Sequence, residues 1–502
     1  MEKIVEMKNI TKIFPGTVAN DDISIDLYKG ETHVLLGENG AGKTTLMNVL
    51  YGLYQAEKGE IFVRGTKVNI RDSSDAIKLG IGMVHQHFML VHNFTVTENI
   101  ILGHEPTSGL VVNIKKAEKD VQDIAKKYGF NVKYDSLISD ITVGQQQKVE
   151  IIKALYRGAD ILILDEPTAV LTPQEIDELA IIIDNLKKEG KSVILITHKL
   201  KEIMKMSDRV TIIRRGKVID SIFTKDVNIN ILAEMMVGRK VNLSVEKKEA
   251  HPKEEVLKVN YLNYIDKRGV KVIDELTLSV RSGEILGIAG VDGNGQSEFV
   301  EILAGFLRAS GGSVKIDDNE IIEKNSEDII KLRFGHVPED RQKRGLLLKF
   351  PLYENAVLGM HKDKKFSNGT ILKYNKIKKH TNEIIKEFDV RTPNENVNAE
   401  TLSGGNQQKL IVGREIFKDP RLLVVSQPTR GLDVGAIEYI HRRLIQERDK
   451  GIAILLVSFE LDEILDLSDR IAVMYGGRIV SVMDRKDADE YKLGRLMAGG
   501  KA

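Results

Sequence analysis

The chain contains the octapeptide Gly37 Glu38 Asn39 Gly40 Ala41 Gly42 Lys43 Thr44, which matches the pattern G-x-x-x-x-G-K-[ST]. The apolar run 34–36 precedes it and the helical run 45–50 follows it. Its glycines allow backbone N–H groups to surround a phosphate, and a helix N-terminus adds a favourable dipole. The alternative is a glycine-rich turn that binds nothing, but a lysine and a threonine at these positions argue against it. We predict that residues 37–45 bind the phosphates of a nucleotide.

The same pattern occurs a second time with its lysine replaced. Residues 290–297 repeat the octapeptide at an offset of 253, and Gln296 stands where the first copy has Lys43. Further along the offset becomes 261, where residues 165–168 match 426–429 and residues 207–209 match 468–470. A long repeat with a stable offset indicates a domain duplication. We predict domains at 1–240 and 256–502, joined by a short charged linker at 241–255.

The amino-acid composition favours a soluble globular protein and excludes sites that depend on cysteine. Of 502 residues, 42% are hydrophobic and 29% are charged, as in soluble globular chains. The 74 basic and 73 acidic residues nearly cancel, so no overall field favours nucleic acid or an anionic bilayer. The absence of cysteine excludes disulfides and thiolate metal sites. The apolar runs are too short to span a bilayer and the N-terminus does not resemble an export signal, so we expect a cytoplasmic chain.

Polar side chains at the ends of apolar runs are predicted to act on the nucleotide. Asp165 and Glu166 follow the run 161–164; the first is placed to hold Mg²⁺ and the second to polarise the attacking water. His198 closes the run 194–196, and Gln86 lies in a loop after another apolar run. Each of these residues alone has an ordinary structural interpretation. Together they predict a catalytic set of Lys43, Gln86, Glu166 and His198, and Mg²⁺ ligands at Thr44, Gln86 and Asp165.

A further glycine-containing segment reads Leu402 Ser403 Gly404 Gly405 Asn406 Gln407 Gln408 Lys409. A serine hydroxyl and two glycine amides before a helix form a second anion-binding cap. Taken in their order along the chain, these motifs resemble the nucleotide-binding domain of ABC transporters. The resemblance covers essentially the whole chain. It implies an α/β fold of two tandem P-loop ATPase domains, each with a parallel-sheet RecA-like core, an antiparallel β region and a helical subdomain. It also implies ATP and Mg²⁺ as cofactors, with Phe14 among the ATP-contacting residues.

The resemblance implies head-to-tail pairing of the two domains, with each ATP between one phosphate loop and the other domain's signature segment. The site of Lys43 would then be completed by Ser403, Gly404, Gly405 and Asp433. The opposite site has substitutions at every catalytic position: Gln296, Glu339, Ser426, Gln427 and Phe459. The first half would cap that site with residues 141–145 and Thr172, which depart from the usual signature. Because all substitutions fall on one composite site, we predict that a single site hydrolyses ATP.

Paired domains with a degenerate second half are similar to the ATPases of importers for nucleosides and for simple sugars. The stretches 82–90, 338–341, 427–438 and 458–461 look more like the purine-nucleoside branch, although none would touch the solute. The resemblance implies two membrane-spanning permease subunits, a solute-binding protein that acts through them, and a peripheral location on the cytoplasmic face of the membrane. Residues 86–100 and 339–344 would face the permease. No nucleic acid partner is implied.

Three alternatives remain open. A sugar importer ATPase of the galactose or ribose type would use the same ATP chemistry. Soluble twin ATPases that act on ribosomes also have two domains, but they normally keep both sites catalytic and have a long helical linker. DNA-repair ATPases of the superfamily carry zinc-binding cysteines, which this chain lacks.

Overall fold

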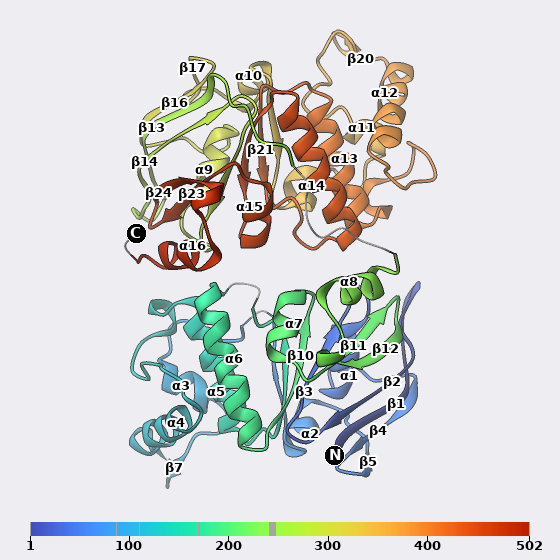
Figure 1. The fold of residues 1–502 in the computed structure, drawn as a ribbon, viewed down its shortest axis with the longest axis vertical. Coiled ribbons are helices and arrows are strands. Elements are labelled where there is room, and N and C mark those ends of the chain that lie inside the picture. Colours follow the sequence, from blue (N-terminus) through green and yellow to red (C-terminus); the bar gives the residue numbers. More distant parts are fainter. Residues whose placement is uncertain (1, 87, 110, 169–170, 240–246, 501–502) are drawn as a thin grey trace. The chain divides into compact units, whose positions relative to one another are not determined.

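The computed structural model describes residues 2–86, 88–109, 111–168, 171–239 and 247–500 (Figure 1). The chain divides into two compact units, unit 1 at residues 1–241 and unit 2 at residues 242–502. Residues 241–246 of the expected linker, and residue 87 of the stretch 82–90, lie outside the described residues. The rest of the linker contacts unit 2: Lys247 Nζ donates to the carbonyl oxygen of Ser468 (2.6 Å), and Arg448 donates to that of Lys248 (2.9 Å).

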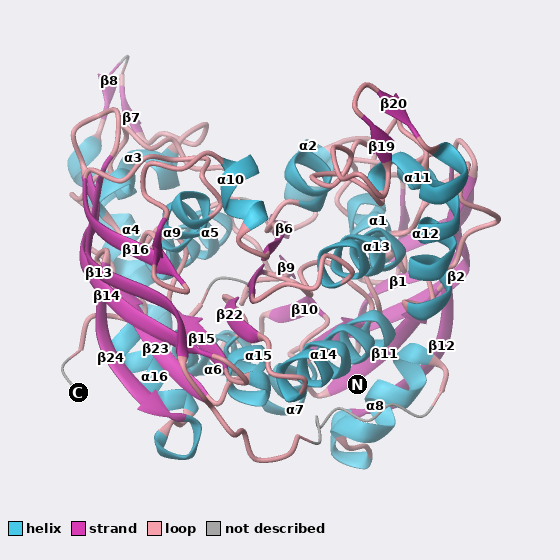
Figure 2. Ribbon diagram, turned by 90° about the horizontal axis from the view of Figure 1, so that it is seen from above, coloured by secondary structure: helices cyan, strands magenta, loops and turns pink. Residues whose placement is uncertain are grey.

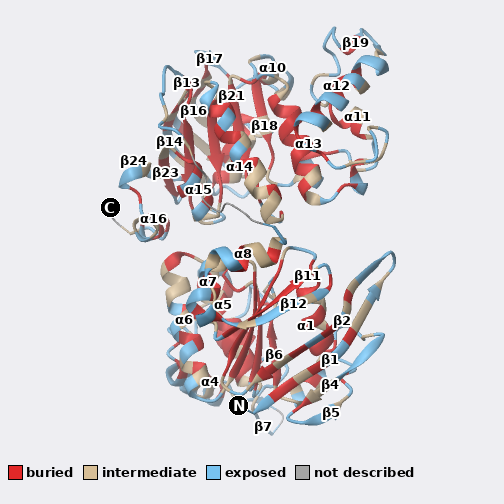
Figure 3. Ribbon diagram, turned by 45° about the vertical axis from the view of Figure 1, so that its right-hand side comes forward, coloured by how far each residue is buried: buried red, intermediate tan, exposed pale blue. Residues whose placement is uncertain are grey.

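Unit 1 is built on a six-stranded sheet of order β12-β11-β3-β10-β9-β6. Its strands are β3 (Thr32–Leu36), β6 (Ile81–Val84), β9 (Ile161–Asp165), β10 (Ser192–Thr197), β11 (Arg209–Arg214) and β12 (Lys217–Phe223). Five strands run parallel and β12 is antiparallel at the edge. Every residue of β3, β9 and β10 is buried, as expected for central parallel strands covered on both faces (Figure 3).

A second, antiparallel sheet of unit 1 holds the helix that follows the phosphate loop. Its order is β2-β1-β4-β5, formed by β1 (Lys3–Phe14), β2 (Thr17–Tyr28), β4 (Lys58–Val63) and β5 (Thr66–Val68). One apolar cluster joins this sheet, helix α1 (Lys43–Leu50) and the central strands through Met7, Ile23, Leu46, Ile163 and Ile194. The shared core fixes α1, and therefore the loop before it, relative to the ends of the central strands.

Among its described residues, unit 1 has seven further α-helices: α2 (Ser73–Lys78), α3 (Val96–Ile101), α4 (Ile114–Tyr128), α5 (Val143–Tyr156), α6 (Pro173–Lys188), α7 (Leu200–Met206) and α8 (Ile229–Val237). Helices α3, α4 and α5 pack together as a helical subdomain, from which a hairpin of β7 (Thr107–Ser108) and β8 (Val111–Val112) extends. Side chains cap α2 to α6, whereas α1 begins at Gly42 without a side-chain cap. The first amides of α1 therefore remain available to a ligand.

Unit 2 repeats this topology. Its central sheet has the order β18-β21-β22-β15-β23-β24, and its antiparallel sheet has the order β14-β13-β16-β17. The strands are β13 (Glu255–Ile265), β14 (Lys271–Arg281), β15 (Ile285–Ala289), β16 (Gly311–Ile316), β17 (Asn319–Glu320), β18 (Phe334–Val337), β21 (Leu422–Ser426), β22 (Ala453–Val457), β23 (Arg470–Tyr475) and β24 (Arg478–Asp484). Each central strand has a counterpart at the same place in unit 1, as the internal repeat predicts.

The helices of unit 2 are α9 (Gln296–Leu303), α10 (Ser326–Lys331), α11 (Leu352–Asn355), α12 (Tyr374–Glu387), α13 (Gly404–Ile416), α14 (Val434–Asp449), α15 (Leu461–Leu467) and α16 (Glu490–Met497) (Figure 2). A hairpin of β19 (Ser367–Asn368) and β20 (Ile371–Leu372) extends next to α11 and α12. Within the described part of the chain, none of the helices combines the length and the apolar character needed to cross a membrane.

Candidate functional site

The predicted catalytic residues of unit 1 lie at one edge of its central sheet. The loop 37–44 follows β3, Asp165 ends β9, His198 follows β10, and Gln86 follows β6. These four strands are neighbours and run parallel, so their carboxyl ends meet at the same edge. Ligands of open α/β sheets bind outside this edge. The fold therefore gathers residues that are far apart in the sequence.

Lys43 is buried beneath the phosphate loop, with 5% of its surface exposed. Its Nζ donates hydrogen bonds to the carbonyl oxygens of Gly37 (2.7 Å) and Glu38 (3.0 Å). Burial lowers the pKa of the Lys43 ammonium, while Glu166 and Asp165 act in the opposite direction. The lysine is thus a fixed cation directly below the loop amides.

Glycine is required at two positions of this loop. Gly42 has a φ of 101°, and a Cβ there would lie 2.2 Å from the carbonyl oxygen of Ala19. A Cβ on Gly37 would lie 2.2 Å from the carbonyl oxygen of Ile213. The buried Asn20 amide also donates to the carbonyl oxygen of Gly42 (3.0 Å). Asn20 belongs to no motif, and the sequence carries no signal for this supporting role.

Thr44 and Asp165 form a pair of oxygen ligands. The Thr44 hydroxyl donates to Asp165 Oδ1 at 3.3 Å. Burial raises the pKa of Asp165 to about 6, and the neighbouring Glu166 adds to this effect. Hydroxyl and carboxylate oxygens suit Mg²⁺, which usually takes only one or two protein ligands beside phosphates and water. No group of three or more His, Cys, Asp or Glu side chains among the described residues could hold a metal ion. The Thr44 hydroxyl and the Asp165 carboxylate are the kind of donors that Mg²⁺ takes.

Glu166 lies at the centre of a hydrogen-bonded triad. Gln86 Nε2 donates to Glu166 Oε2 at 3.0 Å, and His198 Nδ1 lies 3.0 Å from Glu166 Oε1. Burial acts to raise the pKa of Glu166, but the hydrogen bond from His198 and the charge of Lys43 outweigh it and hold the pKa below its usual value. An ionised, fixed carboxylate at this edge can accept a proton from a bound water.

Unit 2 keeps this framework with different side chains. Gln296 Nε2 donates to the carbonyl oxygen of Val291 (3.2 Å), and Ser297 donates to Glu339 Oε2 (3.2 Å). Gln427, at the position of Glu166, accepts a hydrogen bond from the backbone N–H of Phe459 (3.3 Å). An amide at this position cannot act as a base. The second loop thus retains a phosphate-loop conformation without a lysine or a catalytic carboxylate.

The signature segments of the two units differ at the start of their helices. Ser403 precedes α13 and makes no side-chain cap, and its hydroxyl accepts from Asn406 Nδ2 (2.9 Å). Asp433 lies beside this segment, because a Cβ on Gly405 would be 3.3 Å from Asp433 Oδ2. In unit 1, Thr142 forms a capping box with Gln145 at the start of α5. The hydroxyl of Thr142 is therefore already bonded to its own helix.

Arg341 connects the signature segment of unit 2 to its substituted phosphate loop. A Cβ on Gly404 would lie 2.8 Å from Arg341 Nη2, and Arg341 Nη1 donates to the carbonyl oxygen of Arg430 (2.8 Å). Arg430 in turn binds Glu339 Oε1 (2.5 Å), whose other oxygen accepts from Ser297. From the sequence, Arg341 is expected only within the stretch 339–344 that would face the permease. These contacts join segments that are far apart in the sequence, so no local sequence pattern predicts them.

All of the predicted ATP contacts, Phe14 and Thr45 included, stay predictions. Phe14 ends β1, where its ring packs edge-on against Tyr54 (centroids 5.3 Å apart) and lies 5.4 Å from Lys12 Nζ. Thr45 lies in the first turn of α1 and is partly buried.

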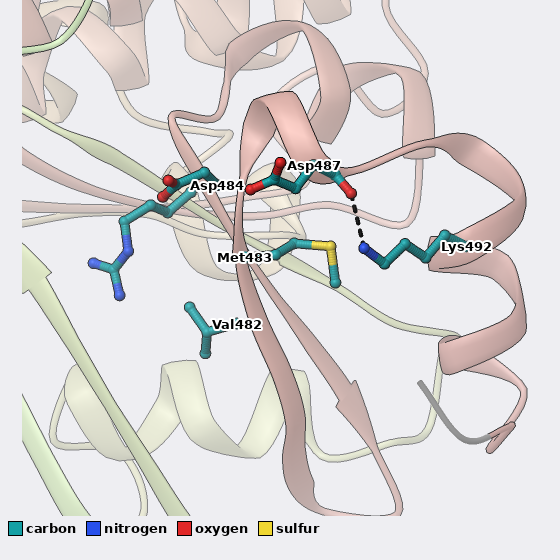
Figure 4. Close-up of a pocket in the computed structure, with 6 residues that line it drawn as sticks. Val482, Met483, Asp484, Asp487 and Lys492 are labelled. Carbon is teal, nitrogen blue, oxygen red and sulfur yellow. Dashed lines mark hydrogen bonds between the residues drawn. The ribbon is translucent and has the colours of Figure 1, made fainter.

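Unit 2 also has an open surface cavity of about 770 Å³ at β24 and α16 (Figure 4). It is lined by Arg470, Val482, Met483, Asp484, Asp487 and Lys492. Its cations are already engaged: Arg470 pairs with Glu284 (2.9 Å), and Lys492 Nζ donates to the carbonyl oxygen of Asp487 (2.9 Å). None of the residues predicted for ATP lines it, and it adds nothing to the site.

Known proteins resemble the chain over its whole length. The sequence profile of a family described as ABC transporter matches residues 20–169 and 273–430. The nucleoside import ATP-binding protein NupA of Lactococcus lactis is 54% identical, over 99% of this chain and 99% of the relative. The guanosine import ATP-binding protein NupO of Bacillus subtilis is 54% identical, over 99% and 98%. The glucose import ATP-binding protein TsgD13 of Haloferax volcanii is 43% identical, over 99% and 96%.

A solved structure also resembles the entire chain. The complex of the archaeal ribosomal stalk protein aP1 and the ribosome recycling factor aABCE1 aligns with a TM-score of 0.62 at 18% identity. The alignment covers 98% of this chain and 92% of that one. At 18% identity the similarity concerns the fold alone. The two chains share an arrangement of two tandem domains.

Proposed function

Because the chain belongs to the ABC transporter family, as its matched profile and its relatives show, we propose that it is the ATP-hydrolysing subunit of a nucleoside importer. The observation that carries the ATPase assignment is the triad of Gln86, Glu166 and His198 beside a complete phosphate loop. The nucleoside assignment is supported by relatives at 54% identity that are named for nucleoside and guanosine import. The relative named for glucose import is less similar, at 43%.

The residues of unit 1 suit hydrolysis of the terminal phosphoryl group. A water oxygen forms a bond to the γ-phosphorus, the bond to the ADP oxygen breaks, and a water proton passes to Glu166. Gln86 and His198 hold the carboxylate in place, and Lys43 supplies positive charge to the β- and γ-phosphates. Mg²⁺, when bound, would be held by Thr44 and Asp165 with help from Gln86, and it would neutralise phosphate charge.

The cap over this ATP is assigned to the other unit. We propose that Ser403, Gly404, Gly405 and Asp433 complete the site of Lys43. The distribution of substitutions supports this assignment, because unit 1 keeps every catalytic residue while unit 2 keeps the signature. Thr142 caps the backbone of its own helix whereas Ser403 does not, and this difference supports the assignment of the signature segment to unit 2.

The proposed partners follow from the importer assignment. Two permease subunits would span the membrane, and a solute-binding protein outside the cell would act through them. The chain would sit on the cytoplasmic face, with residues 86–100 and 339–344 toward the permease. Nucleosides are preferred over simple sugars as the solute, and purine nucleosides over others.

A paired substitution in the assembled transporter tests the proposal. Glu166→Gln should reduce ATP hydrolysis by about 10²–10⁴-fold, because the base is lost while nucleotide binding is retained. Gln427→Ala is the matched control in unit 2 and should leave turnover nearly unchanged.

In cells without other uptake routes, Glu166→Gln should stop uptake of labelled guanosine and spare that of ribose and galactose.

Each part of the proposal has its own contrary result. Equal losses from Glu166→Gln and Gln427→Ala would contradict a single hydrolysing site. Loss of ribose or galactose uptake with guanosine uptake intact would replace the nucleoside assignment by the sugar alternative and leave the ATP chemistry standing.

A further inference from the structure

Unit 2 displays an apolar side chain at the tip of a small hairpin. Strands β19 and β20 pair Asn368 with Ile371 across a two-residue turn that begins with Gly369 (φ 68°). Ile371 is 71% exposed, and Tyr374, just beyond the hairpin, is 49% exposed. The hairpin projects from the α11–α12 region of unit 2 (Figure 1). An isoleucine in this place contributes little to the core of the unit.

The base of the hairpin is well packed, so its tip is held in place. Val357, Phe366 and Ile377 form a small separate core, and Leu372 packs against it. Neighbouring residues of a strand face opposite sides. Leu372 therefore anchors β20 while Ile371 faces away from this core.

The segment that contains this hairpin is rich in lysine. Residues 360–380 contain seven lysines, one acidic residue (Asp363) and no arginine. Lys362 is paired with Glu327 (2.6 Å). Among the described residues, Lys364, Lys376 and Lys379 form no ion pair, and all three are exposed. Within a chain whose net charge is +1, this segment is a concentrated positive patch.

Unit 1 has the same hairpin without the charge. Strands β7 and β8 pair Ser108 with Val111 in the same register, Gly109 has a φ of 68°, and Val111 is 71% exposed. Residues 100–120 contain three lysines and three acidic residues, so their charges cancel. The chain thus offers an internal comparison for the basic hairpin.

We propose that hairpin β19–β20 and its lysines bind an anionic lipid surface. Lysines near a membrane are attracted by acidic headgroups, and an apolar tip with an adjacent tyrosine suits the boundary between headgroups and acyl chains. Nucleic acid is a poorer match, because the patch has no arginine for paired contacts to phosphates or bases. This contact with lipid goes beyond the proposed docking to a permease and does not depend on the solute.

The test measures co-sedimentation of the full chain with vesicles, in the absence of ATP. Vesicles of phosphatidylglycerol and phosphatidylcholine in equal parts should bind the chain about tenfold more tightly than vesicles of phosphatidylcholine alone, and added salt should weaken the binding. Ile371→Asp, and separately Lys364→Glu with Lys376→Glu and Lys379→Glu, should remove most of this binding. The controls are Val111→Asp, and Lys115→Glu with Lys116→Glu and Lys119→Glu, which should bind as the parent does.

Several results would overturn the proposal. Equal binding to both kinds of vesicle, or equal losses from the unit 1 controls, would show that the basic hairpin is not the determinant. Displacement of the vesicles by single-stranded nucleic acid at matched charge would assign the patch to nucleic acid instead. The three lysine positions are exposed, so their variant remains a valid test if Ile371→Asp fails to fold. The vesicle measurement does not involve ATP hydrolysis. A failure of the lipid proposal can therefore be told apart from a failure of the proposed ATPase function.

Discussion

At the scale of single residues, the two halves differ in side chains placed on the same backbone. Glu166 and Gln427 both adopt a left-handed conformation, with φ of 46° and 47°. Their backbone N–H groups donate to equivalent strand carbonyls, those of Ile196 (2.9 Å) and Val457 (2.8 Å). A carboxylate and an amide of nearly the same shape thus occupy one position. The same turn thus accommodates a carboxylate in unit 1 and an amide in unit 2.

Arg341 is expected to position the signature segment for hydrolysis. Arg341→Ala removes the guanidinium that lies against Gly404, so the proposed cap over the ATP of Lys43 would be misplaced. We expect kcat to fall between roughly ten- and a hundredfold, with little change in KM for ATP, because a small misplacement of a catalytic group costs rate. Arg341→Lys should restore only part of the rate, since lysine lacks the planar fork.

Lys349→Ala is the control for Arg341, because this side chain is exposed and lies outside the stretch proposed to face the permease. Steady-state ATPase kinetics of the assembled transporter separate the two parameters. A rise in KM with kcat unchanged would mean that Arg341 does not act through the signature segment.

The sequence points to the candidate site residues more readily than to their supports. Lys43, Asp165 and Glu166 stand in short patterns next to apolar runs. In unit 1, hydrogen bonds link Glu166 with Gln86 and His198, and Asp165 with Thr44, and the catalytic roles of these residues stay predictions. Asn20 and Arg341 act through contacts with segments far along the chain. Such contacts are set by the packing of whole elements, which no local pattern encodes.

At the scale of elements, the repeated triplet Ser-Asp-Arg joins neighbouring strands. Asp208 accepts from the backbone N–H of Thr32 (2.8 Å), and Asp469 accepts from that of Ile285 (2.9 Å). Arg209 binds the buried Glu31 (2.7 Å). The triplet therefore fixes β11 beside β3 in unit 1 and β23 beside β15 in unit 2.

His33 on β3 should make the stability of unit 1 depend on pH. Burial lowers the pKa of His33 to about 4, and the charge of Arg209 acts in the same direction. Between the unfolded pKa of about 6.5 and this value, the unfolded chain binds more protons, so stability falls as pH decreases. A shift of this size corresponds to roughly 3 kcal/mol across the window.

His33→Leu introduces the residue that unit 2 has at the equivalent place, Leu286. Denaturant unfolding at several pH values gives the stability difference between this variant and the parent. That difference should move in favour of the variant as pH falls through the window. A difference that does not change with pH would refute the assignment.

Long buried strands were predictable as elements, whereas the small hairpins were not. The apolar runs 161–164 and 193–196 correspond to β9 and β10, because continuous apolar runs bounded by loops indicate buried strands. Strands β7, β8, β19 and β20 have two residues each, which is too short for any periodicity. Their existence follows from the turn and from the packing below it.

At the scale of the whole molecule, each unit keeps one of the two motifs that we propose to act on the same ATP. Unit 1 holds the phosphate loop with its lysine, and unit 2 holds the unmodified signature segment. The sheets of both units have the same strand order, so the difference lies in side chains at corresponding places. Neither unit has a full set of the residues proposed for turnover.

Gly404→Asp should therefore inactivate a site whose lysine belongs to the other unit. A carboxylate at position 404 would repel the γ-phosphate, and hydrolysis should fall as far as in Lys43→Ala, by at least about 10²-fold. Val143→Asp is the matched control at the equivalent position of unit 1 and should leave turnover nearly unchanged. The measurement is ATP hydrolysis stimulated by the permease. Near-normal turnover in Gly404→Asp would contradict the proposed pairing of the two units.

The left-handed turn at Gln427 bears on what the position of Glu166 demands of the backbone. Non-glycine residues in this region of conformational space carry a cost of about 1–3 kcal/mol. Gln427 has no base to present, yet it keeps the geometry that presents Glu166. The turn therefore belongs to the fold of both units and does not require a carboxylate. Either side chain can occupy this position without a change of the backbone.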